Sequence, residues 1–397
     1  MECGTARIEI TPPFPTALFG YPQVERIFEP HKDRMLDPLQ ARAVYLKAGK
    51  EAGVLLVSLD LCILMNPDAR ALREAIAREV GLPCGRILVA CTHTHSAPLA
   101  RFQPAASGNS PEGRFVSDPL KTSEKYGLWL IGRIRKIARL AVSRKSKVTL
   151  SYRETFTGLG YNRRCRTNKG ILHCWNIQEF PNRIPQPADK VRHGVVRLDY
   201  TGKPGGVVLE SAGIHPVVMG KHSNRASADW PGHARRHIEK RMRGYQAVFF
   251  EGAAAQVQPW ISTQEDPKAL RLVGEAIGGE AVMMALNAQP LDGNQQALSL
   301  KEATIPGTET KISILQLGPL LLLGLPFELS ANWADRICGE LGRPVFFICL
   351  CNGWDSYWMS PEEFAEGGYE AEVAQSRNIN HIQSHALLET LKAEADF

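Results

Sequence analysis

The residues best suited to chemistry are two histidines, His93 and His95, in the segment Val-Ala-Cys-Thr-His-Thr-His-Ser-Ala-Pro at 89–98. The apolar run 86–91 before them predicts a buried strand. Because residues i and i+2 of a strand point to the same side, both imidazoles can face one cavity at the strand end. Open α/β sheets bind ligands there, and two convergent imidazoles are a common start of a zinc site. A structural histidine pair is the equally weighted alternative.

Three further apolar runs end in a polar residue that suits a metal. His215 follows the run 207–214, Glu328 follows 320–325, and Tyr357 follows 344–350. If these strand ends meet at one sheet edge, two histidines and a carboxylate form the kind of set that holds hydrolytic zinc. Each residue also has a structural interpretation, since His215 fits a turn, Glu328 fits a helix N-terminus and Tyr357 fits a core aromatic. Spacing alone does not decide between them.

Strand-length apolar segments alternate with helical patterns along the whole chain, and several strand pairs are joined by short glycine-containing turns. This mixture predicts an α/β (α+β) fold with mixed sheets. The predicted strands are 6–10, 41–48, 54–61, 86–91, 147–153, 191–200, 207–214, 247–250, 297–303, 311–317, 320–325 and 344–350, and the longer predicted helices are 68–80, 124–143, 229–243 and 268–286. The polar, Gly- and Pro-containing segments 101–123 and 165–190 are predicted to be irregular. Because no linker or repeat divides the chain, we predict a single domain over 1–397.

The composition limits the classes of protein to which this chain can belong. The 397 residues are 44% hydrophobic and 22% charged, as in an ordinary globular chain, and no apolar run is long enough for stable membrane insertion. The net charge of +6 is too weak and too dispersed to predict a nucleic-acid partner. Nine cysteines without regular spacing, and no secretory signal before the first strand, predict reduced thiols in a cytoplasmic protein.

Several segments in one order resemble the N-terminal domain of the neutral/alkaline (non-lysosomal) ceramidases. They cover nearly the whole chain, and although no single motif is decisive, together they are fairly specific. The segments are 4–13, with Ile-Thr-Pro-Pro; 92–98, with Thr-His-Thr-His-Ser-Ala-Pro; 162–164, Asn-Arg-Arg; 215–216, His-Pro; 227–232, Ser-Ala-Asp-Trp-Pro-Gly; 252–259, Gly-Ala-Ala-Ala-Gln-Val-Gln-Pro; and 357–370, Tyr-x5-Glu-x5-Tyr-Glu.

The resemblance implies a layered αββα sandwich and a zinc hydrolase that cleaves an N-acyl amide with metal-activated water. The positions that match the family's zinc ligands are His93, His215, Glu328 and Tyr357.

The resemblance also implies roles around the metal. His95 matches a histidine that contacts the reacting carbonyl, while Arg163 and Tyr369 match residues that bind or polarise the amide. Tyr357 is counted with these catalytic residues as well as with the ligands. Asn162 and Arg164 flank Arg163, and we expect them to help bind substrate.

Two departures from the family pattern affect the expected substrate. The family's Gly-Asp is Ala255-Gln256 here, so that acid has no counterpart, and the segments 101–123 and 165–190 offer no long apolar surface for an acyl chain. We therefore expect a small soluble N-acyl compound in place of ceramide, with an anionic group met by the arginines at 163, 164 and 166.

Two other functions stay open on the sequence. The same metal site could serve an ester, lactone or glycosidic bond, since fold and metal do not determine the substrate. The chain could also be a non-catalytic binding protein with a relict site. The substrate, a second metal and assembly into a homo-oligomer are left open.

Overall fold

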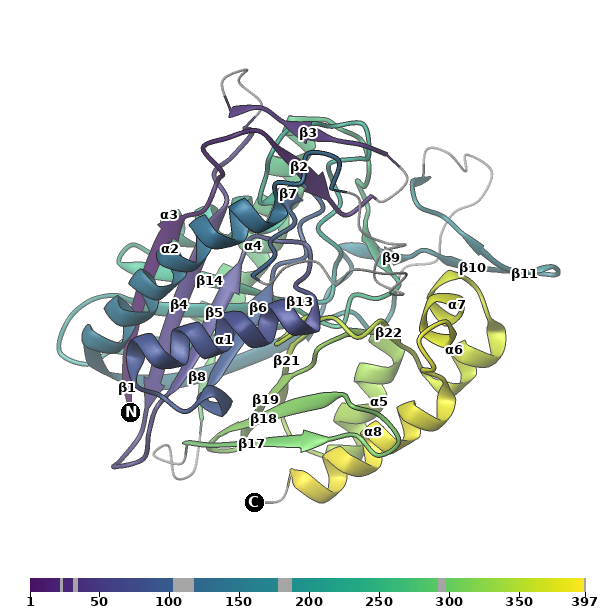
Figure 1. The fold of residues 1–397 in the computed structure, drawn as a ribbon. Coiled ribbons are helices and arrows are strands. Elements are labelled where there is room, and N and C mark those ends of the chain that lie inside the picture. The colour runs from purple at the N-terminus through teal and green to yellow at the C-terminus, as the bar shows by residue number, and fades with distance from the viewer. Residues whose placement is uncertain (22–23, 31–34, 103–117, 178–187, 292–297, 396–397) are drawn as a thin grey trace.

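The computed structural model of this chain describes residues 1–21, 24–30, 35–102, 118–177, 188–291 and 298–395. It is an α/β fold in which two sheets pack face to face, with helices on both outer surfaces (Figure 1). The layered αββα sandwich with mixed sheets is therefore confirmed.

The larger sheet has the strand order β14-β13-β12-β8-β1-β4-β5-β6, and β16 pairs with β8. Its neighbours are antiparallel except for β13–β14 and β5–β6, which are parallel. The strands are β1 (Glu2–Glu9), β4 (Gln40–Lys47), β5 (Val54–Leu59), β6 (Ile87–Cys91), β8 (Lys145–Phe156), β12 (Arg192–Tyr200), β13 (Gly206–Ala212), β14 (Tyr245–Glu251) and β16 (Gln289–Pro290).

Successive side chains along each strand point to opposite faces of this sheet, and the two faces pack against different layers. In β4, Ala41, Ala43 and Tyr45 pack under helices, whereas Val44 and Leu46 pack against the second sheet. A side-chain period of two produces this division. The covering helices are α1 (Asn66–Val80), α2 (Ser123–Ser143), α3 (Asp229–Arg241) and α4 (Pro267–Leu286), with a short 3₁₀ helix, η2 (Cys84–Arg86), before β6.

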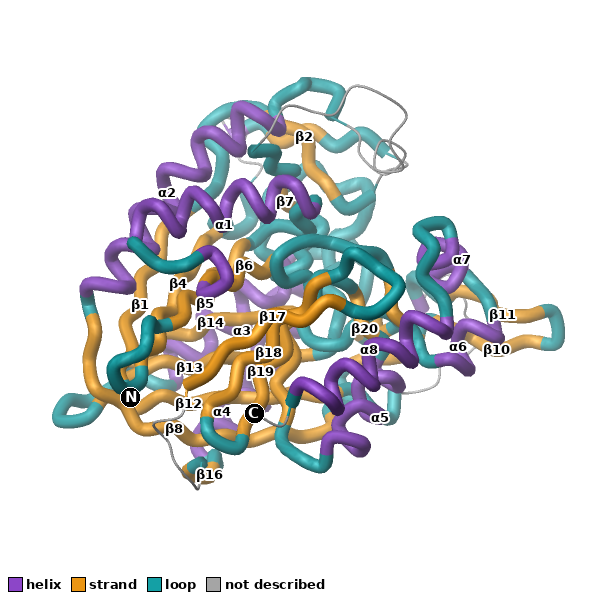
Figure 2. Tube along the Cα trace, turned by 60° about the horizontal axis from the view of Figure 1, so that its bottom comes forward, coloured by secondary structure: helices purple, strands orange, loops and turns teal. Residues whose placement is uncertain are grey.

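The second sheet has the order β17-β18-β19-β21. Its strands are β17 (Leu298–Thr304), β18 (Lys311–Leu317), β19 (Leu320–Gly324) and β21 (Val345–Ile348). Leu315, Leu322 and Phe346 face the larger sheet, while Ile314, Leu323 and Phe347 face the outer helices. Those helices are α5 (Ala331–Leu341), α6 (Pro361–Glu366), α7 (Tyr369–Gln375) and α8 (His381–Glu394). Figure 2 shows α5 and α8 running along this outer surface.

Short strands connect the layers around one end of the sandwich. They are β2 (Thr16–Phe19), β3 (Ile27–Phe28), β7 (Ala97–Pro98), β9 (Gly160–Asn162), β10 (Arg164–Thr167), β11 (Gly170–His173), β15 (Val257–Pro259), β20 (Glu328–Leu329) and β22 (Tyr357–Trp358). The β10–β11 hairpin extends outward beside α6 and α7 in both views (Figures 1 and 2).

Most predicted elements are confirmed to within a few residues. The prediction that 165–190 is irregular is wrong for 165–167 and 170–173, which form the hairpin; residues 178–187 and 103–117 lie outside the described residues. Across the described chain, no helix is both long and apolar enough to span a membrane. The nine cysteines all lie among the described residues, and no disulfide joins any of them.

A buried charge cluster joins α4 to the larger sheet. His193 of β12 has no exposed surface, and its Nδ1 lies 2.6 Å from Glu280 Oε2 of α4. Its Nε2 lies 3.2 Å from Glu210 Oε1 of β13. Burial lowers the pKa of His193, but the hydrogen bonds and charges of the two carboxylates outweigh it and raise the pKa to about 9. The imidazolium thus links helix to sheet close to the end of β13.

This cluster predicts a pH-dependent stability. Because the folded pKa of His193 exceeds the ordinary 6.5, its contribution is complete below pH 6.5 and is lost as the pH rises through 9. The loss corresponds to about 3 kcal/mol. In urea unfolding, the advantage of the wild type over His193→Gln should shrink from pH 6 to pH 9.5. The exposed His381→Gln is the control, and a pH-independent difference would contradict the assignment.

Candidate metal centre

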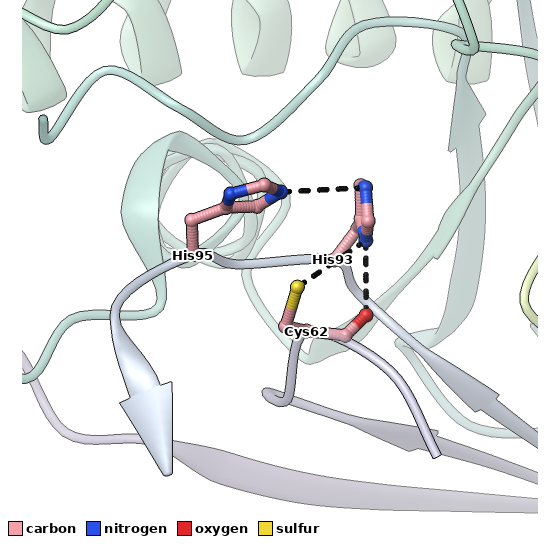
Figure 3. A group of neighbouring side chains, drawn as sticks. All are labelled: Cys62, His93 and His95. Carbon is pink, nitrogen blue, oxygen red and sulfur yellow. Dashed lines mark hydrogen bonds between the residues drawn. The ribbon is translucent and has the colours of Figure 1, made fainter. Parts of the chain in front are cut away.

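His93 and His95 lie just beyond β6, in a turn that reverses the chain. β6 ends at Cys91, and the backbone of His93 is left-handed, with φ at 67°. The simple strand alternation used to predict their common direction therefore does not apply. The two rings nevertheless meet edge to face with centroids 4.8 Å apart, and their Nε2 atoms are 3.4 Å apart (Figure 3).

Backbone carbonyls determine which nitrogen of His93 and of His215 carries the proton. His93 Nδ1 lies 3.0 Å from the carbonyl oxygen of Cys62, and His215 Nδ1 lies 2.8 Å from that of Ala254. A carbonyl oxygen only accepts, so each Nδ1 is the N–H donor and each Nε2 keeps its lone pair. Metal-binding histidines are commonly oriented by such a bond on the opposite nitrogen.

Both Nε2 atoms face one carboxylate oxygen. Glu328 Oε2 lies 3.4 Å from His93 Nε2 and 3.2 Å from His215 Nε2. In the described chain this oxygen is buried without a hydrogen-bond partner, and the three ligand atoms lie within 4.8 Å of one another. Three buried acceptors that face each other repel unless a positive charge lies between them.

The pKa values of His93, His215 and Glu328 are shifted because these groups are buried close to one another. Burial and the charge of Arg163 lower the pKa of His215 to about 4. Burial also lowers the pKa of His93, but the Glu328 carboxylate outweighs it and raises that pKa well above its ordinary value. Burial raises the pKa of Glu328, yet the charge of His93 holds it well below its ordinary value. One proton is therefore shared by His93 and Glu328 and would compete with a metal ion for the centre, while His215 stays neutral.

The donor set fits zinc. A tetrahedral site with ligand distances of about 2.0–2.1 Å places neighbouring ligand atoms about 3.4 Å apart, and the two nitrogen–oxygen distances at Glu328 are 3.2 and 3.4 Å. Two imidazoles and a carboxylate are also ligands that zinc prefers. The orphaned Oε2 of Glu328 and the two aligned imidazoles are the observations that support this fit.

Glu328 and Tyr357 come from adjacent short strands. β20 and β22 are parallel, and Glu328 pairs with Tyr357 in register. The structure therefore brings the phenol beside the carboxylate, and Tyr357 is buried. Burial and the nearby charge of Glu328 raise the pKa of Tyr357 well above its ordinary value, so without a metal ion the phenol keeps its proton.

Asp229 shapes the chain that carries His215. Its carboxylate accepts hydrogen bonds from the backbone N–H groups of Val218 and Met219, at 3.1 and 3.0 Å. The neighbouring Trp230 donates its indole N–H to the carbonyl oxygen of His215 at 3.1 Å. Besides starting α3, Asp229 therefore fixes the loop after His215.

His95 lies at the edge of the centre under an N-terminal loop. Arg26 donates to its carbonyl oxygen at 2.6 Å, and the rings of Tyr21 and His95 are 5.1 Å apart. A Cβ at Gly20, where φ is +113°, would lie 2.7 Å from the Cβ of His95. Burial and the neighbouring His93 and His215 hold the pKa of His95 well below its ordinary value, so it is neutral.

Arg163 approaches the same centre from β9 and β10. Its Nε donates to Glu370 Oε1 at 2.8 Å, and its guanidinium lies 4.6 Å from the centre of the Trp175 ring. The rings of Tyr357 and Tyr369 are each 5.9 Å away. Its Nη2 is buried and unpartnered in the described chain. The structure therefore brings Arg163, Tyr357 and Tyr369 together, with one donor group on Arg163 unused.

Asn162 and Arg164 point into a different set of contacts. Arg164 donates to Glu370 Oε2 at 2.8 Å and to backbone carbonyls at the end of α6, and Asn162 Oδ1 accepts from the backbone N–H of Arg164 at 2.9 Å. Gln256, at the position of the missing acid, accepts from the first N–H of α5 and donates to Glu363. These three residues therefore bind other protein groups, and Arg164 and Gln256 hold Glu370 and Glu363 in position.

A second group of metal-type side chains is Cys62, His93 and His95. Cys62 Sγ lies 3.7 Å from His93 Nδ1, whereas His95 approaches His93 Nε2. Figure 3 shows Cys62 and His95 on different sides of the His93 ring. Because His93 Nδ1 is held by a carbonyl, the group built on its Nε2 is the better metal centre.

Sequence reasoning missed two residues that contact the predicted site residues directly. Glu370 binds both Arg163 and Arg164, and Trp354 donates its indole N–H to Glu328 Oε1 at 3.1 Å. A signal existed for Glu370, since two adjacent arginines in a buried site need a carboxylate. Trp354 lies in a polar loop and carries no comparable signal.

Comparison with known proteins supports the architecture. No family model and no curated protein matches the sequence. The fold resembles the crystal structure of neutral ceramidase from Pseudomonas aeruginosa, with a TM-score of 0.74 and 16% identity over 98% of this chain and 73% of that one. It also resembles a ceramidase complexed with C2, with a TM-score of 0.70 and 17% identity over 98% and 74% of the two chains. The chain therefore has a ceramidase-like fold.

The centre predicts a specific loss of metal on removal of one ligand. The wild type should bind about one zinc ion per chain, and His93→Ala should weaken binding by about 100-fold or more because an acceptor is removed from the set. Metal content after gel filtration and competition with a chromophoric chelator measure this. The exposed His381→Ala serves as the control, and retention of full zinc by His93→Ala would refute the ligand assignment.

Proposed function

We propose that this protein is a zinc-dependent hydrolase that cleaves the amide bond of a small N-acyl compound. The observation that carries the proposal is the convergence of His93 Nε2, His215 Nε2 and Glu328 Oε2, three buried acceptors that need a cation. Tyr357, paired with Glu328, is the proposed fourth ligand. A zinc ion held there would lower the pKa of water from about 15.7 to about 7 and polarise a carbonyl.

The surrounding side chains suit the charge changes of acyl transfer. His95 is neutral and lies beside the centre, so it can donate a hydrogen bond to a developing oxyanion or accept a proton. Arg163 offers its unused Nη2 and a fixed positive charge to the same region. Tyr369, next to Tyr357 with ring centres 5.7 Å apart, adds a phenol at the outer side.

Two observations support the substrate class. The likeness in fold to two ceramidases favours an amide over an ester, lactone or glycosidic bond. Trp175 and Tyr369, which are 37% and 38% exposed, form an aromatic rim over Arg163. Arg164 and Arg166 are paired with Glu370 and Glu366. Arg163 also binds Glu370 but keeps its Nη2 unpartnered in the described chain, so it is the arginine that we propose for a carboxylate or carbonyl of the substrate.

A substrate panel tests the proposal. We expect zinc-dependent turnover of short N-acyl amino acids and N-acyl amines, and loss of that turnover with a chelator. The panel includes the matching esters and lactones and long-chain ceramide in detergent. Turnover of esters or lactones alone would overturn the amide assignment, turnover of ceramide alone would overturn the small substrate, and stoichiometric zinc without any turnover would favour a binding protein.

The role of His95 can be separated from that of the ligands. Because His95 lies beside the centre and outside the His93, His215 and Glu328 set, His95→Ala should keep its zinc yet lose about 10²–10³-fold in kcat. Parallel measurement of zinc content and steady-state kinetics on the best amide distinguishes this from His93→Ala, which should lose both. Unchanged kcat in His95→Ala would exclude His95 from the reaction.

A further inference from the structure

The two oxygens of Glu328 have different environments. Oε2 faces His93 and His215, whereas Oε1 accepts a hydrogen bond of 3.1 Å from the indole N–H of Trp354. Both side chains are buried, at 4% and 6% exposure. We infer that Trp354 is a positioning residue that makes Glu328 bind the metal through one oxygen only.

Trp354 is itself held on several sides. Its backbone N–H donates to Asn66 Oδ1 at 2.9 Å, and the guanidinium of Arg377 lies 4.4 Å from the centre of its ring. A Cβ on the preceding Gly353, where φ is +146°, would lie 2.1 Å from Asn66 Oδ1. The close approach of this loop to α1 therefore requires glycine, and it places the indole in one orientation.

The loop that carries Trp354 adopts an unfavourable backbone. Leu350, Asn352 and Ser356 all have positive φ, at 53°, 66° and 71°. Such conformations cost non-glycine residues free energy and persist where surrounding contacts over-determine them. This loop contacts Glu328 at two points, because Ser356 O accepts a hydrogen bond from the backbone N–H of Glu328 at 3.0 Å and Trp354 donates one to its carboxylate. The strained loop therefore holds both the backbone and the side chain of one candidate ligand.

The indole N–H has a clear physical consequence for the carboxylate. A free carboxylate can rotate or bind a metal with both oxygens, and either change would alter the number of positions left for substrate. With Oε1 occupied by Trp354, only Oε2 faces the histidines. Outer contacts of this kind are commonly worth 10- to 100-fold in metal affinity.

Because this role rests on the proposed metal site, the test begins with zinc binding by the wild type. Trp354→Phe removes the N–H donor and keeps an aromatic ring beneath Arg377. The matched control is Trp358→Phe, since Trp358 is buried, donates its indole N–H to the carbonyl oxygen of Asp355 at 3.1 Å and stacks on Phe327. Zinc affinity is measured by competition with a chromophoric chelator, and the Tm of each metal-free variant is measured in parallel.

We expect Trp354→Phe to weaken zinc binding by about 10- to 100-fold, and Trp358→Phe to stay within threefold of the wild type whatever its Tm. Equal affinities in the two variants would overturn the role of Trp354, even if both lower the Tm. If Trp354→Phe does not fold, Asn66→Ala releases the backbone of Trp354 and should still weaken binding, and an unchanged affinity there would overturn the inference. A wild type that binds no zinc would instead refute the proposed function.

Discussion

The candidate site depends on one electrostatic constraint, the burial of three acceptors directed at a common point. Backbone carbonyls hold a proton on Nδ1 of His93 and of His215, so in the neutral imidazoles each Nε2 is an acceptor, as is the ionised Glu328 Oε2. A single proton satisfies one histidine–carboxylate pair and leaves the other unsatisfied. A divalent cation would satisfy all three, and its binding would then be coupled to the folding of this part of the chain.

The contact between the two sheets sets the geometry of these acceptors. His93 and His215 follow strands of the larger sheet, whereas Glu328 and Tyr357 follow strands of the second sheet. Backbone hydrogen bonds cross between the sheets close to the centre, from Cys349 N to Glu251 O at 2.8 Å and from Asn352 N to Val89 O at 2.7 Å. The packing of the two sheets therefore maintains the site, because a shift of one sheet relative to the other would separate the histidines from the carboxylate.

Sequence periodicity predicted the long strands and helices because their burial follows regular patterns, and it marked His93, His215 and Glu328 because each ends an apolar run. It could not predict the β10–β11 hairpin, because the strand Arg164–Thr167 is polar and, among the described residues, pairs only with the neighbouring strand β11. It could not reveal the positive φ of His93 either, since that turn is imposed by hydrogen bonds to β5 and the residues after it. Trp354 could not be predicted because its contact with Glu328 joins two residues that are 26 positions apart in the chain.

The charges around the centre fit the proposed hydrolase better than a site that only stores an ion. A purely structural zinc site has no need of an adjacent positive charge, which would oppose the binding of the cation. Here Arg163 and Arg164 both bind Glu370, and Arg164 also contacts Glu366 Oε2 at 3.5 Å. The positive charge of Arg163, which interacts with Glu328, therefore shares its carboxylate with a second arginine. That charge contributes to the low pKa of His215, and Arg163 Nη2 remains unused in the described chain. Burying an unpaired donor costs free energy, and an oxygen that gains negative charge during the reaction would recover it.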